Sequence, residues 1–221
     1  MLNRYARVVV TRLLSPLAGL LLRLGVSPDV VTLVGTVGVV SAALWFYPRG
    51  QLLAGTLVIT AFVFSDTIDG IMARASGRSS RWGAFLDSTL DRFADGAVFA
   101  GLVLFFTGAG QHRLTGVLAL ACLVLGAVVS YAKARAEGLG MTADVGIAER
   151  AERLVAVLVA TGLVGLGLPR EVLTVVLAVL AAASAVTVAQ RVLTVRRQAM
   201  AAPGGSGPPT ATAPSAEAPR P

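Results

Sequence analysis

Six long apolar runs separated by short gaps restrict the fold of this 221-residue chain more than any other feature. They span roughly 30–48, 51–74, 82–107, 113–136, 148–168 and 171–195. Each run approaches the about 20 residues that an α-helix needs to cross a bilayer core at about 1.5 Å per residue. Only 14% of the residues are charged, whereas a typical soluble domain has about 25%. The sequence therefore predicts an all-α, polytopic membrane protein with six transmembrane helices.

The basic residues are distributed unequally between the two ends of these runs. Fourteen Lys and Arg residues fall on one set of loops and termini, and only Arg49, Arg113 and Arg170 fall on the other. Loops rich in Lys and Arg stay on the cytoplasmic side, so both termini are predicted to be cytoplasmic. The net charge of +7 is then a signal of orientation and of contact with membrane lipids. Nucleic acid is not expected as a partner, because there is no soluble domain to carry a basic face.

Two terminal segments differ from the apolar region. Residues 1–29 are predicted to be a cytoplasmic interfacial helix and the entry to the first span, because apolar residues recur at helical spacing between arginines. These apolar residues are Leu2, Val9, Leu13, Leu17, Leu20 and Leu24. Ser27-Pro28-Asp29 then offers cap chemistry for the first span. Residues 30–198 form the predicted membrane domain, and the Pro- and Ala-rich residues 199–221 predict a disordered, dispensable tail.

Four aspartates inside the apolar region are its most informative polar feature: Asp66, Asp69, Asp87 and Asp91. A charged side chain in a membrane span costs roughly 2.5–3.5 kcal/mol on insertion scales, so the four predict a functional site. The first two are spaced i,i+3 and the last two i,i+4, which places each pair on one helix face. Counted from the loop at 77–81, both pairs lie roughly 9–16 Å deep. On antiparallel helices they would meet at matching depth.

Four facing carboxylates cannot all stay ionised without cations. Oxygen ligands at this density suit Mg²⁺, Mn²⁺ or Ca²⁺, whereas zinc prefers His or Cys. Two metal ions about 3.5–4 Å apart can hold a pyrophosphate and polarise the attacked phosphorus. A salt-bridged helix hairpin is a weaker interpretation, because few cations lie at that depth. A proton or metal-ion pathway is another, although transport sites tend to lie near the midplane on broken helices.

The spacing of the aspartates resembles a known signature. Asp66 through Asp91 match D-x2-D-G-x2-A-R-x8-G-x3-D-x3-D at every specified position, and this is the motif of the CDP-alcohol phosphotransferase family. The resemblance implies a six-helix membrane enzyme, commonly a homodimer, that moves a phosphatidyl group from a CDP-linked lipid to an alcohol and releases CMP.

The resemblance also implies a role for each matching residue. Asp66, Asp69, Asp87 and Asp91 would bind divalent metals, two Mg²⁺ ions with Mn²⁺ as the alternative. Asp91 would also be the general base on the acceptor hydroxyl. The residues implied to bind CDP-diacylglycerol are Asp29, Thr32, Asp66, Asp69, Gly70, Ala73, Arg74 and Gly83.

A second polar cluster gathers at cytoplasmic helix ends. The stretch 131–137, Tyr-x-Lys-Ala-Arg-Ala-Glu, and the stretch 149–154, Glu-Arg-x-Glu-Arg-Leu, resemble the bacterial phosphatidylinositol-phosphate synthases of the same family. The acceptor of those enzymes is inositol 1-phosphate, whose phosphate suits planar guanidinium groups. Lys133 and Arg135 lie two apart, so at best one of them faces the site fully. The implied acceptor-phosphate contacts are Ser130, Lys133, Arg135, Arg153 and Arg191.

The resemblance thus predicts transfer of a phosphatidyl group from CDP-diacylglycerol to inositol 1-phosphate. The enzyme would lie in the bacterial inner membrane with its active site on the cytoplasmic side. Two alternatives remain open. A phosphatidylglycerophosphate synthase, which uses glycerol 3-phosphate, would need the same kind of phosphate pocket. A metal-ion transporter would use the acidic cluster for a different purpose.

Overall fold

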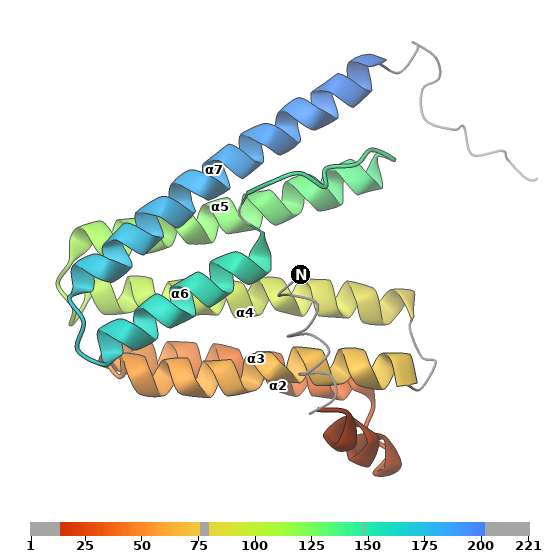
Figure 1. Cartoon of the computed structure of the whole chain (residues 1–221), viewed down its shortest axis with the longest axis horizontal. Coiled ribbons are helices and arrows are strands. Elements are labelled where there is room, and N and C mark those ends of the chain that lie inside the picture. The colour runs from red at the N-terminus through yellow and green to blue at the C-terminus, as the bar shows by residue number, and fades with distance from the viewer. Residues whose placement is uncertain (1–13, 76–79, 148, 202–221) are drawn as a thin grey trace, which may run out of the picture.

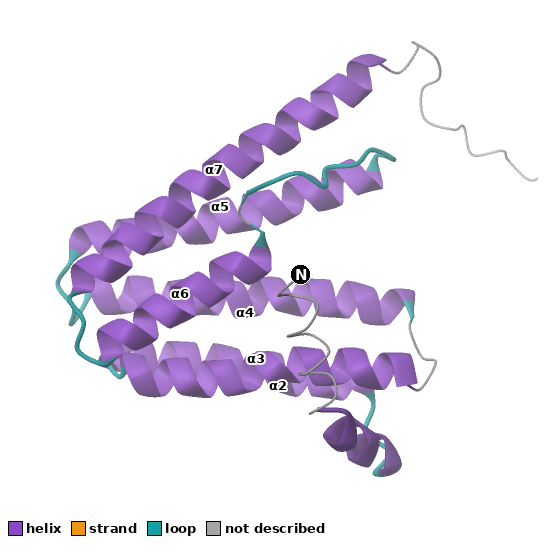
Figure 2. Cartoon of the chain, in the orientation of Figure 1, coloured by secondary structure: helices purple, strands orange, loops and turns teal. Residues whose placement is uncertain are grey.

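The computed structural model describes residues 14–75, 80–147 and 149–201, apart from the side chain of Asp66. All regular secondary structure in these residues is helical (Figure 2). A short helix, Leu14–Arg23, comes first. The elements that follow are α2 (Pro28–Phe46), the 3₁₀ turn η1 (Tyr47–Arg49), α3 (Leu52–Ala75), α4 (Arg81–Thr107), α5 (Arg113–Gly138), α6 (Arg150–Gly165) and α7 (Arg170–Ala201). The predicted all-α fold is confirmed for these residues.

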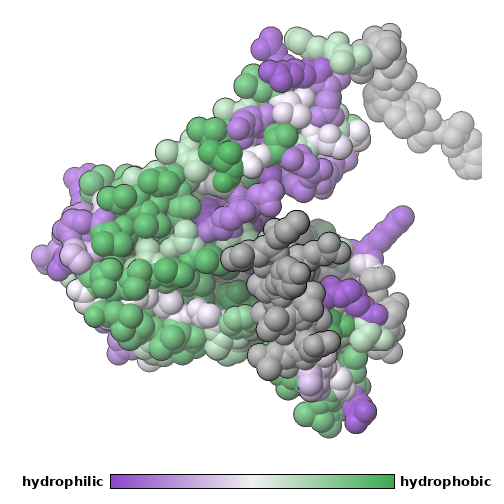
Figure 3. Space-filling view, in the orientation of Figure 1, coloured by the Kyte–Doolittle hydropathy of each residue, from purple (hydrophilic) through white to green (hydrophobic). Residues whose placement is uncertain are grey.

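The long helices form a bundle that opens at one end (Figure 1). Helix α2 packs against α3 and α4, α4 packs against α5, and α5 packs against α7. Helix α6 contacts α3 and α7. At the left of Figure 1 the helices converge, whereas on the right the α5–α7 pair diverges from α3 and α4. Figure 3 shows hydrophobic residues over most of the converging half and hydrophilic ones along the notch between the diverging pairs.

Local sequence signals explain where these helices begin and end. Ser27 caps α2 by accepting a hydrogen bond from the Val30 N–H at 3.4 Å, and Pro28 occupies the first turn, as its sequence predicts. Ser80 caps α4 in the same way through the Gly83 N–H at 2.9 Å. Gly50 closes the turn after η1 at φ 74°, a left-handed conformation that favours glycine.

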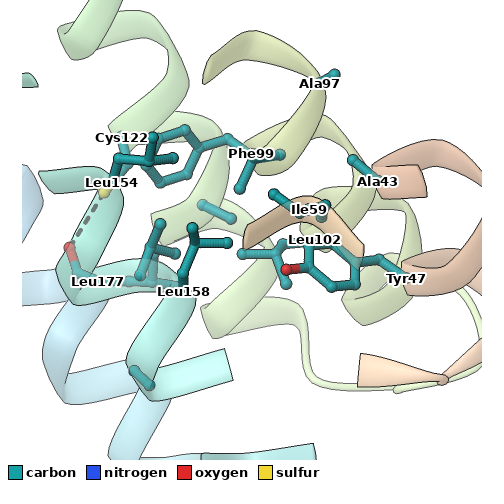
Figure 4. Close-up of a cluster of buried hydrophobic side chains, with 14 of the residues drawn as sticks. Ala43, Tyr47, Ile59, Ala97, Phe99, Leu102, Cys122, Leu154, Leu158 and Leu177 are labelled. Carbon is teal, nitrogen blue, oxygen red and sulfur yellow. Dashed lines mark hydrogen bonds between the residues drawn. The ribbon is translucent and has the colours of Figure 1, made fainter. Parts of the chain in front are cut away.

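The hydrophobic core lies where the helices converge (Figure 4). Tyr47 and Leu102 are fully buried there beside Ile59, and the Tyr47 hydroxyl lies 3.0 Å from Thr56 Oγ1. On the other side of this core, the Cys122 thiol donates to the Leu177 carbonyl at 3.3 Å. The diverging helices project from this closely packed end of the bundle.

Within the described residues, four helical segments are long and apolar enough to cross a membrane: Pro28–Arg49, Leu52–Ala75, Arg113–Gly138 and Arg170–Ala201. The sequence predicts six spans, and the two remaining segments fall short for different reasons. Helix α4 has 27 residues, but its first half carries several charged side chains. Helix α6 has only 16 residues, which corresponds to about 24 Å against a hydrocarbon core of about 30 Å.

The helix Leu14–Arg23 packs against the end of α3. Leu14, Leu21 and Leu22 contact a small cluster that contains Ile68 and Met72. Leu17 and Leu20 on the same helix are exposed, as is Leu24 directly after it. Residues 1–13 and 202–221 lie outside the described residues, so the interfacial helix predicted within 1–29 and the tail predicted over 199–221 stay predictions, and helix α7 continues to Ala201.

Candidate active site

Two of the predicted metal-binding aspartates line one small pocket between α2, α3, α4 and α6. Asp69 reaches it from α3 and Asp91 from α4, and Arg150 of α6 closes it. Thr32 Oγ1 on α2 lies 2.5 Å from Asp69 Oδ2 and 3.1 Å from the Pro28 carbonyl. A hydroxyl has one proton, so we assign it to the shorter contact with the carboxylate. Helix α2 thus contributes directly to the acidic site, between the two motif helices.

The acidic residues suit a hard divalent cation by their chemistry. Asp87 Oδ1 is buried and has no hydrogen-bond partner among the described residues, which is unusual for a carboxylate unless a cation or water is bound. Within that same part of the chain, no three His, Cys, Asp or Glu side chains form a ready-made cage. The Asp66 side chain is not described, so the four-aspartate centre stays a prediction.

Of the residues predicted to bind the nucleotide, Thr32 and Asp69 line this pocket, and the others lie on the same helices, α2, α3 and α4. A Cβ added at Gly83 would lie 3.6 Å from Asp29 Oδ1, so the start of α2 approaches the start of α4 through a glycine. On α3, a Cβ added at Gly70 would lie 3.4 Å from Arg74 Nη1. The guanidinium of Arg74 therefore lies over Gly70 on one face of α3, and Ala73 lies on the same turn.

A larger cleft of about 680 Å³ opens beside the aspartates, between α4, α5, α6 and α7. Its walls carry five basic side chains: Arg92, Lys133, Arg150, Arg153 and Arg191. Of the five predicted acceptor-phosphate contacts, Ser130, Lys133, Arg153 and Arg191 line this cleft. Arg135 is exposed and is not among the lining residues. Lys133 is therefore the member of the Lys133–Arg135 pair that faces the site.

A continuous chain of ion pairs joins the aspartate pocket to this cleft. Arg150 Nη2 lies 2.7 Å from Asp91 Oδ1, and Arg150 Nε lies 3.2 Å from Asp95 Oδ1. Asp95 Oδ2 in turn lies 3.2 Å from Arg153 Nη2. Arg92 contributes a looser pair with Asp91 at 3.6 Å, and its Nη1 donates to Ser130 Oγ. The aspartate pocket and the cleft therefore share the side chain of Arg150.

The segment between α5 and α6 makes hydrogen bonds with α7, and Glu149 at its end lines the cleft. Arg191 Nε donates to the Val145 carbonyl at 3.0 Å, and its Nη1 donates to the Val129 carbonyl at 2.5 Å. Lys133 Nζ lies 2.5 Å from Asp144 Oδ1 in the same segment. This hydrogen bond and the charge of Lys133 lower the pKa of the exposed Asp144 carboxyl. Asp144 thus stays ionised, and paired with Lys133, to a lower pH than a free aspartate.

Two residues of this network, Arg92 and Asp95, belong to no site predicted from the sequence. Arg150 lies in the predicted basic cluster but is not among its predicted acceptor-phosphate contacts. One signal could have indicated Asp95, because it follows Asp91 at i+4 and continues the stripe that begins at Asp87. No comparable signal exists for Arg92, whose side chain reaches Ser130 only because α4 and α5 pack together.

The fold and the site together define a helical membrane protein in which an acidic pocket adjoins a basic cleft. Residues 25–148 match the CDP-alcohol phosphatidyltransferase family. This match covers more than half of the chain, and the chain belongs to that family.

Two similar proteins are phosphatidylinositol phosphate synthases. The one from Streptomyces avermitilis is 55% identical over 204 residues, which cover 90% of this chain and 84% of that protein. The one from Cutibacterium acnes is 49% identical over 193 residues, 84% of this chain and 93% of its own length.

Similar solved structures come from the phosphatidylinositol phosphate synthase of Mycobacterium tuberculosis. A crystal structure with CDP-DAG bound has a TM-score of 0.80 at 44% identity, and the match covers 83% of this chain and 94% of that one. A second, in complex with manganese and citrate, also has a TM-score of 0.80 at 44% identity, with coverages of 83% and 88%.

Proposed function

We propose that this protein transfers the phosphatidyl group of CDP-diacylglycerol to inositol 1-phosphate, which yields phosphatidylinositol phosphate and CMP. The observation that carries the proposal is the 680 Å³ cleft with five basic side chains directly beside Asp91. A cleft of that charge suits an acceptor that carries a phosphate. Relatives at 55% and 49% identity that are phosphatidylinositol phosphate synthases support this acceptor.

The aspartates would hold the metal ions and serve the proton transfer. Asp66, Asp69, Asp87 and Asp91 would bind two Mg²⁺ or Mn²⁺ ions, and a similar protein that was crystallised with manganese supports a divalent ion. Such ions, when bound, neutralise the pyrophosphate of the lipid donor and polarise its phosphorus. The Asp91 carboxylate would accept the proton of the acceptor hydroxyl. As the new oxygen–phosphorus bond forms, the bond between that phosphorus and CMP breaks, and CMP leaves.

The residues on either side of Asp91 would orient the two substrates. The cytidine diphosphate would lie among residues at the starts of α2 and α4 and on α3, namely Asp29, Thr32, Gly83, Gly70, Ala73 and Arg74. On the other side, Ser130, Lys133, Arg153 and Arg191 would bind the acceptor phosphate. Arg135 would act there only if its exposed side chain turned inward.

The proposal includes six membrane spans with both termini and the active site on the cytoplasmic side of the bacterial inner membrane. Four helices have the length and composition for this. Helices α4 and α6 would complete the set, with the charged half of α4 turned toward the site. The exposed apolar residues of the Leu14–Arg23 helix support its placement in the interface. The homodimer implied by the family resemblance belongs to the same proposal, and cross-linking in native membranes would test it.

The direct test is a turnover assay on detergent-solubilised protein with CDP-diacylglycerol and a panel of alcohols. We expect CMP release with inositol 1-phosphate and little with free inositol. A preference for glycerol 3-phosphate would instead identify a phosphatidylglycerophosphate synthase. Equal use of free inositol would contradict the role given to the basic cleft. Cation flux through proteoliposomes without CMP formation would favour the transporter alternative.

A further inference from the structure

Asp95 lies one helical turn beyond Asp91 and, by spacing alone, resembles a further metal ligand. Its surroundings assign it a different task. The residue is only 7% exposed, and its two carboxylate oxygens are each 3.2 Å from a guanidinium nitrogen of α6. Arg150 contacts one oxygen and Arg153 the other. Asp95 therefore lies behind two arginines of the basic cleft and neutralises part of their charge.

Gly126 of α5 approaches the same Arg153 guanidinium closely. A Cβ added at Gly126 would lie 3.0 Å from Arg153 Cζ, 3.1 Å from Nη2 and 3.2 Å from Nε. These distances are shorter than ordinary van der Waals contact. Any larger residue at position 126 would therefore displace the guanidinium from its present position. Arg153 itself is 2% exposed. The Arg153 side chain is thus held between the Asp95 carboxylate of α4 and the backbone of Gly126 in α5.

The confined guanidinium still has an unused donor. Arg153 Nη1 is buried and has no hydrogen-bond partner among the described residues, and the same is true of Arg92 Nε. An unpartnered buried donor is costly unless a ligand or water satisfies it. Both arginines line the 680 Å³ cleft and also a smaller cavity of about 120 Å³ behind it. A phosphate oxygen that entered from the cleft would supply the missing acceptor.

We propose that Asp95 and Gly126 are positioning residues that form a socket for Arg153, so that its free Nη1 is directed to the acceptor phosphate. This inference rests on the proposed function, because it assumes a phosphorylated acceptor. Asp95 also holds Arg150, the residue that contacts Asp91. Without the Asp95 charge, Arg150 would keep its ion pair with Asp91, whereas the buried Arg153 would lose the carboxylate that holds it and would shift from its place in the cleft wall.

The test compares full-length Asp95→Asn and Gly126→Ala with the wild-type protein. The first keeps the size of the side chain and removes its charge, and the second forces the guanidinium to shift by a few tenths of an ångström. We expect each to raise the KM for the phosphorylated acceptor about tenfold, the effect of losing one charge-assisted hydrogen bond. The KM for CDP-diacylglycerol should change less than about twofold. Loss of folded protein would lower kcat and leave both KM values unchanged, so the split in KM distinguishes positioning from a purely structural role.

Gly138→Ala is the matched control for Gly126→Ala. It lies on the same helix, and a Cβ there would meet nothing within 4 Å, so its kinetics should equal those of the wild type. Inositol 1-phosphate and glycerol 3-phosphate are assayed in parallel. If the wild type uses neither, the proposed function and the socket are both wrong. If it uses one, and both variants keep the wild-type KM for it, only the socket is wrong.

Discussion

Replacing Arg191 by Gln should destabilise the protein as well as weaken acceptor binding. Arg191 is 6% exposed and donates from Nε and Nη1 to carbonyls of two different segments, Val145 and Val129. A hydrogen bond from a charged donor contributes about 1.5–3 kcal/mol. The Val129 carbonyl lies within α5 and also accepts the backbone N–H of the helical residue four positions later. It therefore keeps one hydrogen bond when Arg191 is replaced. We therefore expect a loss of about 2–4 kcal/mol in the free energy of unfolding.

For a chain of this length that loss corresponds to a fall in Tm of roughly 5–15 °C. Thermal unfolding in detergent measures it, with Arg197→Gln as the control, since Arg197 lies on the same helix and is exposed. The control loses the same charge and should stay within about 1 °C of the wild type. The acceptor KM of Arg191→Gln should also rise. An unchanged Tm with a raised KM would refute the anchoring role and leave Arg191 as a substrate contact alone.

Three further outcomes are expected. Asp69→Asn and Asp87→Asn should each reduce CMP release at least about hundredfold while the protein still inserts into the membrane. A chelator should reduce the activity of the wild type in the same way. Activity that survives chelation would contradict the metal site. Thr32→Val removes the 2.5 Å hydrogen bond to Asp69 and should lower kcat/KM for CDP-diacylglycerol about tenfold. Unchanged kinetics would mean that Thr32 serves only the structure of α2. Ending the chain after Met200 should leave turnover and Tm unchanged, and a loss of either would show that the tail packs against the membrane domain.

The acidic part of this site can be predicted from the sequence because its aspartates are spaced so that they lie on one face of a helix. Asp87 and Asp91 are four residues apart on one continuous helix, so one face must carry both wherever that helix packs. Ser27 and Pro28 begin α2 for equally local reasons. The long apolar runs likewise predict helices, since a segment in lipid must satisfy its own backbone hydrogen bonds.

The tertiary structure decided which side chains from different helices meet. Arg92 reaches Ser130, and Asp95 pairs with Arg150 and Arg153, across gaps of 38, 55 and 58 residues. Such contacts depend on how α4, α5 and α6 are rotated against one another, and no short-range pattern encodes that rotation. The orientation of Arg135 away from the cleft is decided in the same way. The sequence therefore determined the helices and the acidic motif, whereas packing determined which basic residues line the acceptor cleft.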